Sequence, residues 1–207
     1  MTVIEPHPRP TPLQQAGMTV EALATPALSI LEVADVALLR LHSLAVPVAL
    51  DAALGKAGIS LTPDTGSVTG EEPAVLCLRP GEWLMICETT DPDVWVERLT
   101  PLLDPDLSAL LNLSDGLGMF RLSGPAAPWL LAKFSGLDFL ADPSKGRQAT
   151  RTRFADIGVV VHAHPGKGGE RQFDLVFDRS VAPYLWGLLK DAAPHARELT
   201  ERHGSAA

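Results

Sequence analysis

The chain has 207 residues, of which 46% are hydrophobic and 20% are charged, and its formal net charge is −8 at pH 7. This composition is typical of a globular protein, and a chain of this length can bury most of the surface that it exposes when unfolded. The negative charge argues against a nucleic-acid partner, because binding to a phosphate backbone depends on clustered lysine and arginine.

No apolar run is long enough to span a bilayer, and the first residues lack the basic, apolar and small-residue order of a signal peptide. We therefore expect a cytoplasmic protein with no membrane partner. Residues 1–26 hold five prolines and no sustained hydrophobic period, which predicts an irregular N-terminal arm. The arm is either a loose terminus or a segment that becomes ordered on another chain, and its sequence does not decide between the two.

The next part of the chain predicts strands, short helices and a hairpin. Residues 28–34 and 36–43 have strand patterns, residues 47–56 a helical pattern, and residues 59–72 the composition of a polar loop. Two further strands, 74–78 and 82–87, are joined by a turn in which Pro80 and Gly81 suit the centre of a type II turn. A helix over 92–103 follows, with Asp91 as its N-cap. Its predicted core stripe is Val94, Trp95, Leu99 and either Leu102 or Leu103.

The two cysteines, Cys77 and Cys87, flank this turn. If Arg79 pairs with Glu82, Cys77 lies opposite Leu84 and not opposite Cys87. We therefore expect two buried free thiols, since unpaired cysteine commonly behaves as a small core residue.

The second part of the chain repeats the plan. Strands are predicted over 109–113, 117–122, 150–154, 157–163 and 171–177, and helices over 125–134 and 181–191. Gly124 is the expected N-cap of the first of these helices, with the Ser123 hydroxyl capping its free N–H groups. Trp129 and Phe134 are expected to face the core. Residues 196–207 are expected to form a C-terminal tail, and residues 27–195 a single α+β domain with a mostly antiparallel sheet.

Internal similarity supports a duplication. Adding 81 to the positions of Arg40, Leu41, Ala45, Pro47 and Leu50 reaches the same residue types, and the run 83–88 matches the pattern of 173–178 at an offset of 90. We therefore predict two related strand-helix-hairpin-helix halves, about 27–105 and 106–195, whose apolar faces close one shared core.

Few residues suggest chemistry. His162 and His164 are two positions apart on a predicted strand, which places both rings on one face, as a pair of metal ligands would require. No third ligand is evident beside them and a hairpin loop follows at 165–169, so a metal site is disfavoured. The loop also lacks the Ser or Thr that follows the lysine of a phosphate-binding loop, since Gly168 follows Lys167.

The run from Gly116 to Arg121 lacks the third glycine of a dinucleotide-binding motif, and no serine lies in the G-x-S-x-G context of a hydrolase nucleophile. Asp115 could act as an acid or base in a cleft, although a turn residue before Gly116 is the simpler interpretation. We assign no catalytic, cofactor-binding or metal-ligating residue. Asp115, Arg121 and Ser123 are kept as candidates for contact with a ligand or a partner.

The chain carries four recognisable segments, in the order RPGEWLMI, LSDGLGMFRLSGPAAPWLLAKFSGLDF, TRTRFADIGVVVHA and FDLVFDRSVAPYLWGLLKDAA. In this order they resemble the gamma subunit of heterotetrameric sarcosine oxidase. The resemblance extends from about Leu28 to Ala193. Its most specific parts are the run from Arg121 to Pro125 with the helix after it, and the segment from Phe177 to Trp186.

The resemblance implies a non-catalytic subunit with a fold similar to the folate-binding domain of aminomethyltransferases, which is itself built from two related halves. In such complexes the larger subunits hold FAD, FMN, NAD and tetrahydrofolate, oxidise sarcosine and pass its one-carbon unit to tetrahydrofolate. We therefore expect no cofactor in this chain, and alpha, beta and delta subunits as its partners. The alternative is a stand-alone folate-binding or one-carbon-transfer-like protein, for which Asp115 is the carboxylate to test.

Overall fold

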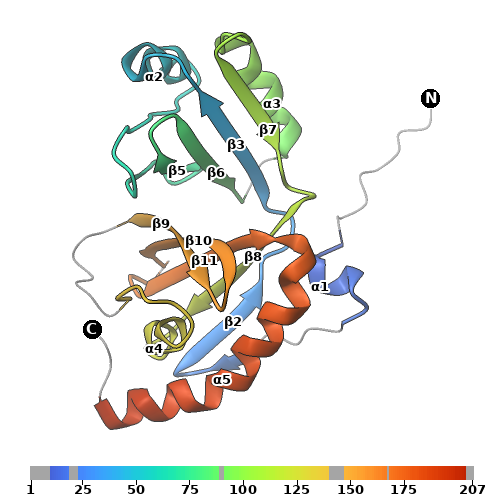
Figure 1. Cartoon of the computed structure of the whole chain (residues 1–207), viewed down its shortest axis with the longest axis vertical. Helices are drawn as coiled ribbons and strands as arrows, with labels where there is room; N and C mark the ends of the chain where they lie inside the picture. Colours follow the sequence, from blue (N-terminus) through green and yellow to red (C-terminus); the bar gives the residue numbers. More distant parts are fainter. Residues whose placement is uncertain (1–9, 19–22, 89–90, 140–146, 167, 204–207) are drawn as a thin grey trace.

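Two antiparallel sheets lie face to face in the computed structural model, and helices cover their outer sides (Figure 1). The structure describes residues 10–18, 23–88, 91–139, 147–166 and 168–203. Among these residues, no helix combines the length and the apolar character needed to span a bilayer. The six-stranded sheet has the order β1 (Leu23–Thr25), β2 (Leu28–Glu32), β8 (Leu117–Ser123), β11 (Arg171–Asp178), β10 (Ile157–Pro165), β9 (Gln148–Phe154). The five-stranded sheet has the order β4 (Val68–Thr69), β5 (Ala74–Arg79), β6 (Glu82–Cys87), β3 (Ala37–Ser43), β7 (Ser108–Asn112).

The helices divide between the two sheets. They are α1 (Pro12–Gln15), α2 (Pro47–Gly55), α3 (Pro92–Leu99), α4 (Ala127–Ala132) and α5 (Ala182–His203). One outer core joins the six-stranded sheet to α1, α4 and α5, and another joins the five-stranded sheet to α2 and α3. The α+β class with antiparallel sheets is therefore as predicted.

The order of the strands confirms two related halves. In the five-stranded sheet, β4-β5-β6-β3-β7 corresponds position by position to β9-β10-β11-β8-β2 in the other sheet. Each half also has two helices in equivalent places. One follows β3 in the first half and β8 in the second, and the other follows β6 in the first half and β11 in the second. The short β1 is an addition at the edge beyond β2.

The halves exchange one strand each. β2 precedes β3 in the chain, yet it pairs with β8 in the other sheet, while β7 lies in the second part of the sequence and pairs with β3. The sheets therefore do not follow the predicted segments 27–105 and 106–195 strand by strand. Because each sheet contains a strand from the other segment, neither segment can form its full sheet alone.

The predicted shared core forms only part of the interior. Alternating residues of each strand point to opposite faces, so Met119 meets the other sheet while Phe120 and Leu122 meet the helices. An apolar layer between the sheets joins Leu38 and Leu84 to Met119, Val160 and Val176. Trp129 and Phe134 are half-buried in the outer core, not in this inner layer.

Two helix ends differ from prediction. α4 begins at Ala127, not at Pro125, and it has no side-chain cap, so the expected role of Ser123 as a cap is wrong. Gly124 instead adopts φ +96°, and the Ala126 N–H donates to the carbonyl of Ala27 (2.9 Å). A Cβ at Gly124 would lie 2.6 Å from that carbonyl oxygen, so this position requires glycine.

α5 continues through residues 192–203, where a tail was expected from 196, and it contains Pro194. Proline inside a helix removes one hydrogen bond, at a cost of about 3 kcal/mol. Ala193 and Ala196 are buried in the outer core, which offsets part of this cost, and the Thr200 hydroxyl donates to the Ala196 carbonyl (3.0 Å).

The N-terminal arm is also more ordered than predicted. Thr11 and Gln14 form a capping box around α1, and Leu13 is fully buried in the outer core. The pattern Thr11-Pro12-Leu13-Gln14 is a recognisable helix start, with Pro at the first helical position. In α3, by contrast, Val94 is exposed although it was placed in the core stripe, while Trp95 and Leu99 are buried as expected.

The thiol prediction is confirmed, because Cys77 and Cys87 are both free and buried. Burial raises the pKa of both thiols, that of Cys87 to about 12. The predicted register is wrong by one residue. Arg79 does pair with Glu82, but a bulge between Cys77 and Arg79 places Cys77 opposite Trp83 and not opposite Leu84.

Candidate functional site

The charged side chains between the two sheets form two clusters around buried acids. Arg40 and Glu82 lie on the inner faces of β3 and β6, on the same side as the apolar Leu38 and Leu84. Arg121 and Asp174 occupy the corresponding faces of β8 and β11, where they are register partners. The inner layer is therefore partly apolar and partly ionic.

The first cluster surrounds Glu82, whose side chain is fully buried. Arg40, Arg79 and Arg151 all pair with its carboxylate, and Arg151 Nη2 lies 2.6 Å from Oε1. Burial alone would raise the pKa of Glu82, but the hydrogen bonds from the three arginines lower it to about 2. Because Arg151 belongs to β9 and Glu82 to β6, this cluster ties the two sheets together.

The second cluster surrounds Asp174, which is 1% exposed. Arg121 donates to both of its oxygens, from Nε to Oδ1 (2.6 Å) and from Nη2 to Oδ2 (2.9 Å). The same guanidinium also donates to Glu88, just beyond β6, at 2.7 and 3.1 Å. Burial would raise the pKa of Asp174, yet the positively charged Arg121, which donates to both of its oxygens, holds it well below its usual range. This cluster also joins the two sheets.

His162 and His164 complete the second cluster. His162 is the register partner of Asp174 across the β10–β11 hairpin, and His164 lies two residues further on. His164 Nε2 is 2.9 Å from Asp174 Oδ2, and His162 Nδ1 is 3.6 Å from the same oxygen, beyond hydrogen-bonding distance. Burial lowers the pKa of His162. The expectation that no third ligand lies beside the two histidines is therefore wrong, because Asp174 faces them from the next strand.

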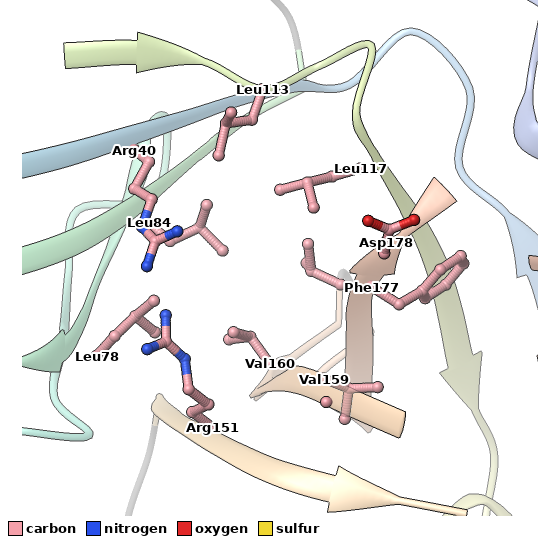
Figure 2. Close-up of a pocket in the computed structure, with 12 residues that line it drawn as sticks. Arg40, Leu78, Leu84, Leu113, Leu117, Arg151, Val159, Val160, Phe177 and Asp178 are labelled. Atoms are coloured by element: carbon pink, nitrogen blue, oxygen red, sulfur yellow. The ribbon is translucent and has the colours of Figure 1, made fainter. Parts of the chain in front are cut away.

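A cavity of about 280 Å³ lies between the sheets beside the Glu82 cluster. Figure 2 shows the guanidinium groups of Arg40 and Arg151 extending toward each other from opposite sheets, with Asp178 on the far side. The other walls of the cavity are mainly apolar and include Leu84, Val160 and Val176. An apolar cavity with a few polar groups can hold a small ligand, although this volume is near the lower end for such sites.

Two of the predicted candidate residues lie on one strand face, and the third lies elsewhere. Arg121 and Ser123 are two positions apart on β8, and Arg121 is central to the second cluster. Asp115 is exposed in the turn before β8, at the opposite end of that strand from Ser123, and its carbonyl accepts from Arg179 (3.3 Å). The turn interpretation of Asp115 is confirmed. Lys167, in the loop compared with a phosphate site, lies outside the described residues.

Sequence reasoning missed the buried acids Glu82 and Asp174 and their partner Arg151. Their signal is an acid within a strongly apolar strand, as in Phe173-Asp174-Leu175-Val176-Phe177. Such an acid is rarely buried unless it is paired. The 81-residue offset also relates Arg40 to Arg121, and both pair with such an acid.

The ionic state of these acids limits their chemistry. Glu82 and Asp174 are held as anions with low pKa values. A general base works best with a pKa near the operating pH, so both groups are poorly suited to proton transfer. Their arrangement is better suited to holding the sheets together.

Comparisons with known proteins match this chain to one family. Residues 42–195 match the family model described as SoxG, the sarcosine oxidase gamma subunit family. The chain is also similar to a chain of the heterotetrameric sarcosine oxidase from Corynebacterium sp. U-96 in complex with pyrrole 2-carboxylate. In that match, 28% of residues are identical, the TM-score is 0.73, and 91% of this chain and 96% of that chain are covered.

A second similar structure is the glycine cleavage system aminomethyltransferase T from Bartonella henselae. Here the identity is 15%, the TM-score is 0.54, and 77% of this chain but only 44% of that chain is covered. This match confirms the expected similarity to aminomethyltransferases at the level of the fold. No curated protein matches the chain.

Proposed function

Because this chain belongs to the sarcosine oxidase gamma subunit family, we propose that it is a non-catalytic subunit that packs against the large subunit of a heterotetrameric sarcosine oxidase. The alpha, beta and delta subunits are its partners in this proposal. They carry FAD, FMN, NAD and tetrahydrofolate and couple the oxidative demethylation of sarcosine to tetrahydrofolate in the cytoplasm. The gamma chain supplies a docking surface and no reacting group.

The observation that carries this proposal is an exposed apolar tip, which we define as Leu44, Val46, Val48 and Leu107. Their exposed fractions are 76%, 68%, 79% and 42%. The Leu44 N–H donates to the Leu107 carbonyl (2.8 Å), which joins the loop before α2 to the segment before β7. Figure 1 places α2 and this end of β7 at the opposite end of the molecule from α5.

Several large apolar side chains in one exposed region are typical of a protein interaction site. The neighbouring β7 is an edge strand whose Leu111 is 50% exposed. An unpaired strand edge beside an apolar patch favours contact with another chain, because it also offers free backbone donors and acceptors. We infer that the apolar tip and β7 meet the large subunit.

The test is co-expression of this chain with the other oxidase subunits, followed by purification of the complex. Leu44→Asp places a charge in the apolar tip but outside α2, and we expect it to weaken association at least about tenfold, since a buried unpaired charge is costly. Native mass spectrometry gives the subunit stoichiometry, and sarcosine turnover gives the activity of the complex.

The matched control is Tyr184→Asp, because Tyr184 is also a large exposed side chain (53%) but lies on α5. This control should leave the complex intact. The proposal fails if the remaining subunits keep their stoichiometry and full turnover when this chain is removed. If, in addition, calorimetric titration of the isolated chain with a folate releases or absorbs heat, the stand-alone ligand-binding alternative is favoured. The cavity beside Arg40 and Arg151 is then the candidate binding site.

A further inference from the structure

We propose that His162, His164 and Asp174 form a binding site for a divalent transition-metal ion, for which zinc is the best fit. Their donor atoms lie within 4.8 Å of one another. Two neighbouring strands supply them, because His162 faces Asp174 across the β10–β11 hairpin and His164 lies on the same face of β10. The site is separate from the apolar tip and from the cavity beside Glu82.

The first argument is the tautomer of His164. Its Nδ1 lies 3.1 Å from the carbonyl oxygen of Pro165. A carbonyl oxygen can only accept, so in the neutral tautomer that makes this contact Nδ1 carries the proton and Nε2 holds a lone pair. That lone pair lies 2.9 Å from Asp174 Oδ2, which is also an acceptor. In this tautomer the two acceptors repel each other unless a proton or a metal ion is bound by both of them.

The second argument is His162, which is 3% exposed. Within the described part of the chain, neither of its ring nitrogens has a hydrogen-bond partner. A buried polar atom without a partner costs about 1–3 kcal/mol in stability. Its Nδ1 is 3.6 Å from the same oxygen that His164 approaches, and the two rings stack with centroids 4.5 Å apart.

A proton on His164 would relieve only one of these two contacts. It would supply a donor to Asp174 Oδ2 but would leave both nitrogens of His162 without a partner. A metal ion would accept a lone pair from each histidine and from the carboxylate. The metal ion therefore relieves the contact at His164 and also gives one nitrogen of His162 a partner, whereas the proton relieves the contact at His164 alone.

The surrounding groups suit a metal ligand set. The Nδ1–H of His164 is held by a backbone carbonyl, and Asp174 is held by Arg121, as ligating side chains commonly are. The positive charges that act on the site each have a carboxylate partner. Arg121 is paired with Glu88, and Arg147, whose charge acts on His162, is paired with Glu71 at 2.9 Å. Each carboxylate oxygen has two lone pairs, so Oδ2 can accept from Arg121 and still bind an ion.

Two imidazoles and one carboxylate favour zinc or a similar transition metal over calcium or magnesium, which prefer all-oxygen sites. Three protein ligands leave one position of a tetrahedral ion for water. The ion would tie β10 to β11 beside the Arg121–Glu88 pair that joins the sheets. Its role in this proposal is structural.

The experiment is a Co²⁺ titration of the full-length chain, with any affinity tag removed, followed by visible absorption spectroscopy. We expect one equivalent to bind with the intense visible bands of a low-coordinate site, and Zn²⁺ to displace it. His164→Gln should weaken binding at least about tenfold, because a ligand is lost. His42→Gln is the matched control, since His42 is an exposed histidine on β3, and it should change nothing.

A second measurement on the wild-type chain avoids any loss of fold in the variant. Zn²⁺ should shift the ¹⁵N resonances of the rings of His162 and His164 and leave those of His42 unchanged. The proposal is overturned if Co²⁺ produces no such bands, or if His164→Gln binds as tightly as the wild type. It is also overturned if the resonance shifts occur only at other histidines, or if both ring nitrogens of His164 keep their protons in the presence of Zn²⁺.

Discussion

The two halves of this molecule solve the same packing problem with different results. Arg40 and Arg121 occupy equivalent positions 81 residues apart, and each pairs with a buried acid on the next strand. In the second half the acid, Asp174, is directly opposite its arginine. In the first half Leu84 is opposite Arg40, and the acid, Glu82, lies two residues away on the same strand face.

That shift changes the surroundings of each acid. Among the residues that the structure describes, the ion-pair partners of Glu82 are all arginines, whose side chains are 38–60% exposed, so every group in the cluster has a charged partner or water. Asp174 meets one mostly buried arginine and two histidines, one of which has unpartnered nitrogens. The comparison shows how a repeated unit can hold two sheets together in both copies and retain unused ligand atoms in one of them.

The largest effect should come from Asp174→Asn. It leaves Arg121 with Glu88 alone as a partner, and loss of one member of a buried ion pair commonly costs 3–5 kcal/mol. We expect the free energy of unfolding to fall by about 3 kcal/mol, measured by urea denaturation in the presence of a chelator. A loss below about 1 kcal/mol would contradict the claim that the Asp174 cluster stabilises the chain more than the better hydrated Glu82 cluster.

Glu82→Gln should cost less, about 2 kcal/mol, because its three arginines remain hydrated. The wild type should also lose this contribution at low pH. The pKa of Glu82 is about 2 in the folded chain against an ordinary 4.5, so its stabilisation is full above pH 4.5 and declines as the pH falls toward 2. Urea denaturation of both proteins at pH 7, 5, 4 and 3 measures the difference.

The difference between wild type and Glu82→Gln should therefore shrink as the pH falls below about 4.5. A difference that stays constant over this range would show that Glu82 acts by packing and not by charge. Glu71→Gln is the control, because Glu71 is 86% exposed where it pairs with Arg147. Exposed pairs contribute little, so we expect a change of at most about 0.5 kcal/mol.

Local elements could be predicted from the sequence because local chemistry determines them. Pro80 and Gly81 mark the hairpin turn, and Gly81 has φ +80° as a type II turn requires. The bulge that places Cys77 opposite Trp83 has no comparable signal in the sequence, since it depends on how β5 packs against its neighbours. The continuation of α5 past Pro194 was missed for a similar reason, because the burial of Ala193 and Ala196 in the outer core is a tertiary contact that the local sequence does not signal.

Long-range pairing was the main limit. The period of 28–34 predicts a strand, but the choice of β8 as the partner of β2 is set by the fit of whole sheets. The same limit hid the candidate site. His162 and His164 were recognised as a pair, whereas Asp174 joins them only through the register of the β10–β11 hairpin. That register could have been derived by counting back from the loop at 166–170.

Hydrogen–deuterium exchange of the chain alone and in the purified complex tests the docking account most directly. We predict slower exchange in the complex over residues 44–48 and 107–112, where the apolar tip and β7 would be covered. Exchange in β6 and β11 should change little, because their backbone bonds are already formed within the chain. Protection confined to α5, with residues 44–48 exchanging as fast as in the free chain, would contradict the proposed docking surface.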